Sequence, residues 1–273
     1  MPCLSGASTI RSLYQPLQPA LRLAEEHIHY QEWLPDLRLQ PYVYCYWQLK
    51  TPQVLTEAFT YRVVADGCID IFLECSRPQA SFITGFAGRY TAFCLGTAFH
   101  YIGIRFLPAM LPLCFPVTAA ALSHTTRPLD DVLPGMAAFF KARFHPLLKE
   151  TEIRSLLDRY LLKHLATVKL HEDHRMLEAV TGILEQAGSM PVARLDTGIS
   201  PRQLRRLFEH YIGDTPKVFS KVVRFQNLLK ADPAFHSLRL SKRFFDLGYY
   251  DQAHFIREFR QLYGLTPGQV FRG

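Results

Sequence analysis

The sequence lacks most of the features that mark a secreted, membrane-spanning or zinc-binding protein. Its six cysteines all lie within the first 114 of 273 residues and form no C-x-x-C pair, which favours small buried thiols over a zinc site. No basic stretch followed by an uninterrupted apolar core stands at the start, so no signal peptide is expected. The most apolar segment, residues 106–122, holds three prolines and is too short to span a membrane comfortably. A cytoplasmic protein without membrane contact is therefore expected.

Signatures of catalysis and of cofactor binding are also missing. The sequence has no nucleophile elbow, phosphate-binding loop or dinucleotide-binding motif in a suitable context. His27 and His29 with Glu32 have the spacing of a metal site, but they precede the predicted strands, and a solvated segment is the favoured interpretation. His100 is the one histidine of the strand-rich region, which disfavours a metal-binding barrel. No catalytic residue, metal or cofactor is predicted, and the protein is not expected to be an enzyme.

The last quarter of the chain is short of acidic residues. Residues 199–273 carry 13 basic and 6 acidic side chains, whereas residues 1–198 carry 18 of each. All of the net charge of +7 therefore lies in the C-terminal segment. Such asymmetry indicates a basic module with a polyanionic partner, joined to a neutral body.

The pattern of apolar residues changes from strand-like to helical along the chain. Short runs rich in aromatic and β-branched residues recur between Pro41 and Phe106 and are separated by glycines, which is typical of a small barrel or sandwich. Helical periodicity follows in residues 153–168 and again in residues 171–187, before Gly188. The sequence predicts an α+β protein with a β-rich regulatory domain over 1–148, a helical connector over 149–172 and an all-α domain over 173–273.

The basic segment contains an internal repeat at an offset of 51 residues. Ser200, Leu204, Arg206 and Phe208 recur as Asp251, Phe255, Arg257 and Phe259, and Gly213, Thr215 and Pro216 recur as Gly264, Thr266 and Pro267. Ser200 and Asp251 have side chains that accept hydrogen bonds from first-turn amides, which predicts that each begins a helix. The apolar pair in each copy is spaced i,i+4 and is expected to face a core. The opposite faces are rich in Arg and Gln, a helix-turn-helix signal.

These residues resemble the DNA-binding domain of the AraC/XylS transcription regulators, in which a long helix joins two helix-turn-helix units. The resemblance covers residues 173–273 and is most specific over Gly248–Phe259. It implies recognition helices at 200–211 and 251–262, with a linker helix at 217–230. The expected scaffold helices, near residues 192–197 and 243–245, depart from the usual pattern. Their packing against the recognition helices is expected to differ accordingly.

The repeat also predicts which side chains meet double-stranded DNA. Arg can read guanine and Gln can read adenine in the major groove, while hydroxyl, amide and basic groups commonly bind phosphates. The predicted base contacts are Arg202, Arg205, Arg206, Gln252, Ala253, Ile256 and Arg257, with Arg206 shared between base and phosphate. The predicted phosphate contacts or helix caps are Ser200, Thr215, Lys217, Asp251, His254 and Thr266.

The first half is similar to an uncharacterised N-terminal domain found on some AraC-type regulators. Family members commonly carry a cupin-like β-barrel there, for small-molecule sensing or dimerisation. An effector pocket is predicted from the aromatic residues, with Arg105 or Asp66 as a polar anchor, although core packing explains most of these aromatics equally well. Its predicted lining is Trp47, Tyr61, Phe82, Phe86, Tyr90, Phe99, Tyr101 and Arg105. The 153–168 helix either pairs between two chains in a homodimer or packs on its own barrel, and the second arrangement is favoured.

The resemblance implies a bacterial DNA-binding transcription regulator. Activation through contact with RNA polymerase is expected, with the N-terminal domain modulating it through a small-molecule effector. The first alternative is a cupin-like metal-binding protein or small-molecule enzyme that carries a basic tail. The second is a ligand-responsive interaction protein that has lost DNA binding, and the outward Arg and Gln faces argue against it.

Overall fold

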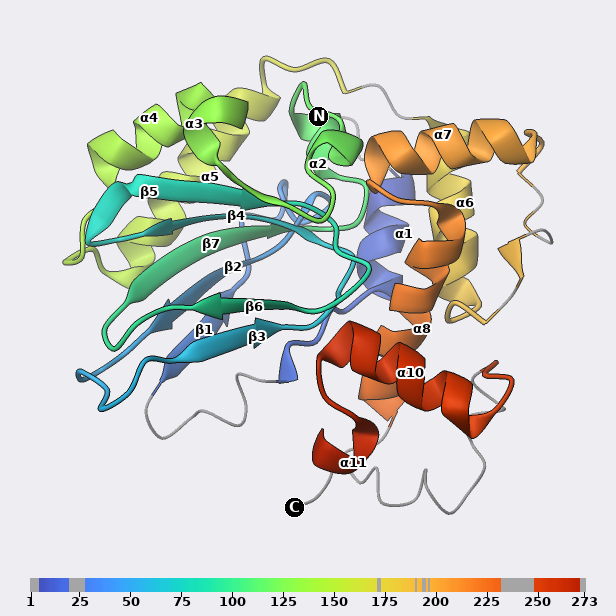
Figure 1. Cartoon of the computed structure of the whole chain (residues 1–273). Helices are drawn as coiled ribbons and strands as arrows, with labels where there is room; N and C mark the ends of the chain where they lie inside the picture. Colours follow the sequence, from blue (N-terminus) through green and yellow to red (C-terminus); the bar gives the residue numbers. More distant parts are fainter. Residues whose placement is uncertain are drawn as a thin grey trace.

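A computed structural model describes residues 5–19, 28–170, 173–189, 191–192, 195, 197–231 and 248–270. Figure 1 shows a β-rich part, flanked by helices, beside a helical part. The predicted α+β class is confirmed. Within the described ranges, no helix combines the length and hydrophobicity needed to cross a bilayer.

Two antiparallel sheets form the β-rich part. The larger has the order β1-β2-β7-β4-β5-β8 and comprises β1 (His29–Trp33), β2 (Val43–Lys50), β4 (Ile69–Glu74), β5 (Arg77–Thr84), β7 (His100–Phe106) and β8 (Thr126–Pro128). The smaller is a ribbon of β3 (Thr60–Val63) and β6 (Thr91–Cys94). Strand β7 is buried from Ile102 to Phe106 because β2 and β4 cover its two edges. Figure 1 shows the ribbon on the opposite side of the large sheet from the helices α3, α4 and α5.

Those helices are α3 (Leu129–Val132), α4 (Pro134–Arg143) and α5 (Glu150–Leu165), and α2 (Leu111–Cys114) precedes them. Helix α5 lies on its own sheet, as the apolar period predicts. Its Asp158 accepts hydrogen bonds from the Tyr46 hydroxyl at 2.8 Å and from the Asp36 amide at 3.0 Å. The ring of His164 stacks on Phe115, with centroids 4.3 Å apart. These contacts bind the expected connector firmly to the β-rich part.

The helical part contains α6 (His174–Glu185), α7 (Pro201–Tyr211), α8 (Pro216–Ala231), α10 (Gln252–Tyr263) and α11 (Pro267–Val270). The N-terminal helix α1 (Ser5–Leu13) joins it, since a Cβ at Gly6 would lie only 2.8 Å from a methyl carbon of Leu177 on α6. One continuous core runs through both parts and includes Tyr14, Phe219 and Val222. The domain limits expected from the sequence stay a prediction, because α1 packs with helices from the other end of the chain.

The internal repeat is visible in the backbone. Gly213 and Gly264 end the two related helices with φ of 104° and 93°, and Pro216 and Pro267 begin the helices that follow. The predicted core pairs are confirmed, because Leu204, Phe208, Phe255 and Phe259 are all buried. The expected second scaffold helix, 243–245, lies outside the described residues, as do positions 193, 194 and 196 of the first.

Candidate DNA interface and effector cavity

Helix α7 presents three arginines to solvent. Its N-terminus is fixed by a capping box, in which the Ser200 hydroxyl accepts a hydrogen bond from the Gln203 amide and the Gln203 side chain accepts one from the Ser200 amide. Because Leu204 and Phe208 face the core, the opposite face is turned outward. Arg202, Arg205 and Arg206 are all exposed. Arg205 donates to Glu209 at 2.8 Å, an exposed pair that contributes little stability and can open to release the guanidinium.

Helix α10 repeats this arrangement with different chemistry. Asp251 caps it by accepting a hydrogen bond from the His254 amide at 2.6 Å. The exposed face carries Gln252, Ala253, Ile256 and Arg257. It therefore combines one amide, one guanidinium and an apolar patch, which suits reading base edges and thymine methyl groups.

The side chains predicted to bind phosphate or cap helices lie at the starts of the helices. Thr215 accepts a hydrogen bond from the Val218 amide at 3.3 Å, and Thr266 contacts the Gln269 side chain at 3.0 Å. Lys217 is exposed on the first turn of α8. The His254 imidazole lies 3.6 Å from the Glu258 carboxylate and packs edge-on against Tyr249.

Glu258 is an important residue that sequence reasoning missed. It is 4% exposed and receives a 2.5 Å hydrogen bond from Arg224 of α8, while Lys221 lies 3.7 Å away. Arg224 also lies over the Tyr249 ring, 4.5 Å from its centroid. The sequence signal for Glu258 is a difference between the two copies, because the first copy has Leu207 at the matching position. This acid joins α10 to α8 and neutralises charge inside the basic segment.

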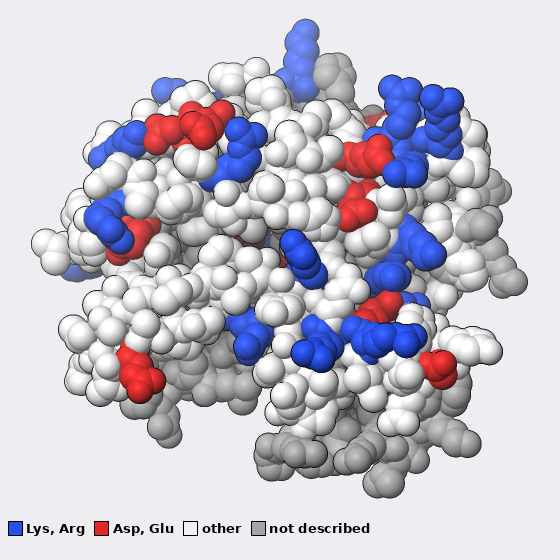
Figure 2. All heavy atoms as spheres, in the orientation of Figure 1, with Lys and Arg blue, Asp and Glu red and all other residues white. Residues whose placement is uncertain are grey.

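Many of the remaining cations of the segment lie on the face that Figure 2 shows. There, Lys and Arg outnumber Asp and Glu over α7, α8 and α10, although some acidic groups lie among them. The localisation of charge seen in the sequence is therefore also a localisation in space. A surface of this kind attracts a polyanion and concentrates it near the two exposed helix faces.

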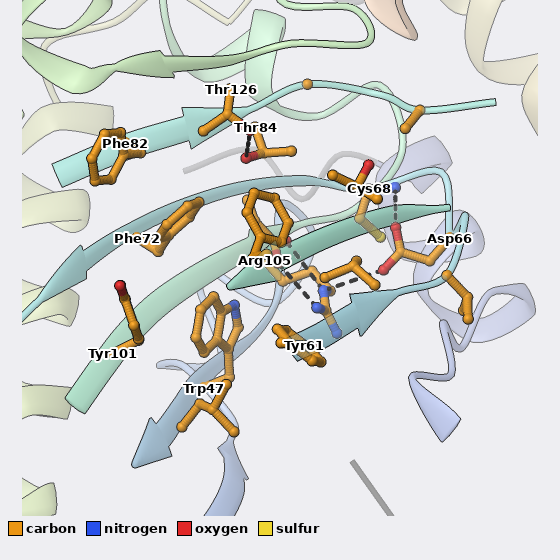
Figure 3. A pocket seen from close by; sticks show the side chains of 18 of the residues that line it. Trp47, Tyr61, Asp66, Cys68, Phe72, Phe82, Thr84, Tyr101, Arg105 and Thr126 are labelled. Atoms are coloured by element: carbon orange, nitrogen blue, oxygen red, sulfur yellow. Dashed lines mark hydrogen bonds and ion pairs between the residues drawn. The ribbon is translucent and has the colours of Figure 1, made fainter. Parts of the chain in front are cut away.

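A second candidate site is a cavity of about 290 Å³ in the β-rich part, between the large sheet and the β3–β6 ribbon. Five of the predicted pocket residues line it: Trp47, Tyr61, Phe82, Tyr101 and Arg105. It is also lined by Asp66, Asp70, Phe72 and Phe93. Figure 3 shows the aromatic rings around Arg105.

Three predicted pocket residues lie elsewhere, and the prediction is wrong for them. Phe86 is fully buried in the main core and packs edge-on against His124, whereas its neighbours Gly85 and Ala87 line the cavity. Phe99 stacks on Phe59 with centroids 5.9 Å apart. Tyr90 is 37% exposed and lies beside Gly264 at the end of α10. Aromatic content alone could not assign these rings to a face.

Charged groups meet at the floor of the cavity. Arg105 donates to both oxygens of Asp70, at 3.1 and 3.0 Å, and lies 3.6 Å from Asp66 and from Glu32. Burial raises the pKa of Asp70 to about 6 in spite of Arg105, with Asp66 adding to the rise. The contact of both Asp70 oxygens with the Arg105 guanidinium favours the ionised form of this carboxyl group. In the described part of the chain, no three His, Cys, Asp or Glu side chains are grouped as metal ligands.

Comparison with known proteins agrees with this geometry. A model of a helix-turn-helix domain matches residues 196–273, and a model of a domain of unknown function matches residues 31–128. The C-terminal segment is an AraC-type helix-turn-helix domain. The chain is accordingly a DNA-binding transcription regulator.

The solved structures include one similar chain, and the similarity is distant. This is ToxT from Vibrio cholerae O395, which is 9% identical, with a TM-score of 0.40. The match covers 90% of this chain and 97% of that chain. No curated protein sequence matches.

The AraC-type domain contacts the rim of the cavity directly. The Ala65 amide donates to the Leu262 carbonyl at 3.1 Å, and the Tyr90 amide donates to the Gln261 carbonyl at 3.0 Å. The Gln261 side chain returns a hydrogen bond to the Gly88 carbonyl at 3.1 Å. Ala65 lines the cavity, and Tyr90 lies between the lining residues Arg89 and Thr91. The last turn of α10 is thus attached to two walls of the cavity.

Helix α8 of the AraC-type domain is attached to the same rim. Gln226 is fully buried and donates to the Ala65 carbonyl at 2.9 Å. Its side-chain oxygen accepts a hydrogen bond from the Leu17 amide at 2.7 Å. The neighbouring Gln18 binds Val64 and the Asp66 carboxylate. A movement of the rim would therefore alter the hydrogen bonds that hold both α8 and α10.

Proposed function

We propose that this protein is a sequence-specific transcription activator that inserts α7 and α10 into successive major grooves on one face of DNA. The observation that carries the proposal is the pair of N-capped helices with exposed Arg and Gln faces, within one basic surface. Successive major grooves lie about 34 Å apart, the spacing of two half-sites one helical turn apart.

In this proposal the two helices read different base edges. Arg205 leaves Glu209 to bind a guanine, and Arg202 and Arg206 act beside it. On α10, Gln252 pairs with adenine and Arg257 with guanine, while Ala253 and Ile256 contact thymine methyl groups. Ser200, Thr215, Lys217, Asp251, His254 and Thr266 lie near the helix starts, where amides and hydroxyls commonly bind phosphates.

The proposal includes control by the β-rich domain. Support comes from the hydrogen bonds that join Ala65, Tyr90 and Gly88 of the cavity rim to α8 and α10. A small-molecule effector that moves this rim would change how α10 is held relative to α7. A ligand can shift the equilibrium between two rim positions only by the difference between its binding free energies for those positions. RNA polymerase is the proposed target of the activated state, and a homodimer is a further proposed partner.

The experiment is selection of bound duplexes from a randomised DNA pool with the full-length chain, followed by sequencing. A motif with two conserved blocks about one helical turn apart is expected. Recovery of unselected sequence would contradict the proposal. A binding constant that does not change with salt concentration would also contradict it, because neutralising phosphates releases counterions.

A further inference from the structure

The cavity has aromatic walls arranged around Phe72. The ring centroid of Phe72 lies 5.6 Å from that of Phe82 and 6.1 Å from those of Trp47 and Tyr101, and Phe93 of the ribbon stands edge-on at 6.4 Å. These rings come from four strands of the sheet and one of the ribbon. The face of each ring is electron-rich and attracts a cation that lies over it.

Trp47 owes its position to Gly103. The two residues are paired across β2 and β7, and a Cβ on Gly103 would lie 2.2 Å from the indole ring. The indole therefore lies flat across the strand, where a side chain would otherwise stand. Its N–H is buried and has no well-aligned hydrogen-bond partner among the described residues. It lies near the Asp70 carboxylate, and this interaction lowers the pKa of Asp70 against the effect of burial.

The floor of the cavity exposes carboxylate groups more than it exposes the arginine that lies beside them. The Arg105 side chain is only 3% exposed, whereas Asp70 is 17% and Asp66 is 11% exposed. The guanidinium is covered by three carboxylates, those of Asp66, Asp70 and Glu32. The charged residues that line the cavity are Asp66, Asp70, Arg89 and Arg105, so its formal charges balance, and Glu32 contacts the guanidinium without lining the cavity. A molecule that enters meets carboxylate oxygens before it meets the guanidinium.

We infer that this cavity binds a small organic cation, a protonated amine carried on an aromatic or apolar body. The inference rests on the proposed control by the β-rich domain and names the chemistry of its effector. The ammonium group would approach Asp70, and the aromatic rings would bind both its charge and its apolar body. The volume suits a molecule with a single ring better than a larger ligand.

An organic anion fits the floor of this site poorly, although the exposed Arg89 also lines the cavity. Nε and Nη2 of Arg105 already donate to Asp70, and Nη1 is directed toward Glu32 at 3.6 Å. A carboxylate could reach the guanidinium only by displacing another carboxylate, in a place where like charges repel strongly. A neutral molecule of the same shape would keep the apolar contacts but lose the attraction of Asp70.

The test is isothermal titration calorimetry of the full-length protein with three probes of similar shape: 2-phenylethylamine, 2-phenylethanol and 3-phenylpropionate. The amine is expected to bind about tenfold more tightly than the alcohol, and the carboxylate to show no binding. Equal or tighter binding of the carboxylate would overturn the inference, as would absence of amine binding.

Two variants locate the binding. Asp70→Asn keeps the size of the side chain and is expected to remove the preference for amine over alcohol. Asp130→Asn, at an exposed position of α3, is expected to retain that preference. If Asp70→Asn does not fold, Gly103→Ala provides the second test, because its methyl group would displace the Trp47 indole and weaken both amine and alcohol. Unchanged amine affinity in both variants would place the amine elsewhere and overturn the inference.

These titrations, together with measurements of DNA affinity with and without the amine, separate this inference from the proposed function. Sequence-specific DNA binding without amine binding would overturn the ligand assignment alone. Amine binding that leaves DNA affinity unchanged would support the ligand assignment and contradict control of DNA binding by the cavity.

Discussion

The two copies of the helix-turn-helix motif share a backbone but differ in charge and in attachment. The first copy, α7, carries three exposed arginines and contacts the short 3-10 helix η2 (Ala119–Ala121) and its flanking loop. There Ser123 donates to the Gly213 carbonyl, and His124 lies 3.0 Å from Asp214. The second copy, α10, carries two exposed arginines, Arg257 and Arg260, and is attached to the cavity rim. Duplication thus preserved a shape while the two copies acquired different surroundings.

This difference indicates that the two copies have different tasks. The copy with more charge is suited to holding DNA, since phosphate attraction is long-ranged and independent of sequence. The copy attached to the cavity is suited to transmitting a signal, because its last turn shares hydrogen bonds with the wall of the site. Four variants test this division, each with a counterpart in the other copy or on the neutral surface.

The largest effect is expected at Glu258. Glu258→Ala leaves Arg224 nearly buried without its partner, and the free energy of unfolding is expected to fall by about 3 kcal/mol in urea denaturation. Leu207, at the matching position of the first copy, is half-buried. Leu207→Ala should therefore lower the free energy of unfolding by less. Adding Arg224→Met to Glu258→Leu should recover most of the loss. If the double variant is no more stable than Glu258→Ala, the ion pair is not the cause.

Arg257 is expected to show the next largest effect. Arg257→Ala should weaken binding to the selected DNA by about 1–3 kcal/mol and relax the preference at one base position. Competition assays on single-base variants of the site measure both quantities. Arg143→Ala, on the β-rich part, serves as the control. An equal loss on every sequence would show that Arg257 contacts only phosphate.

Gln261 tests the attachment of α10 to the cavity. Gln261→Ala removes one hydrogen bond to the Gly88 carbonyl and should cost about 1 kcal/mol locally. Faster hydrogen exchange of the amides around Tyr90 is the expected result. His210→Ala changes the matching position of the first copy and should leave that exchange unaltered. Equal rates in both variants would show that this side chain does not hold the rim.

Lys217 should show the smallest effect. Lys217→Ala is expected to weaken binding to all duplexes alike and to reduce the slope of log K against log salt by about 1. Lys141→Ala on α4 provides the matched control and should leave the slope unchanged. A loss confined to one sequence would instead make Lys217 a reader of bases.

The sequence predicted those features that depend on neighbouring residues. Caps, turn glycines and the i,i+4 apolar pairs are local features, and their repetition in register predicts both helices. The aromatic cavity was predicted only in part, since Phe86 and Phe99 belong to similar apolar runs but face other layers. The packing of α1 on α6 and the attachment of α10 to residues 65–90 join segments far apart in the chain. Local patterns carry no signal for such contacts, and Glu258 could be found only by comparing the two copies.

Hydroxyl-radical footprinting of the full-length protein on a selected duplex tests the central claim most directly. Two protected patches on one face of the DNA, about one helical turn apart, are expected. Arg206→Ala should weaken protection of one patch, and Arg257→Ala should weaken protection of the other. A single patch, or loss of the same patch in both variants, would contradict the claim that the two copies read two successive grooves.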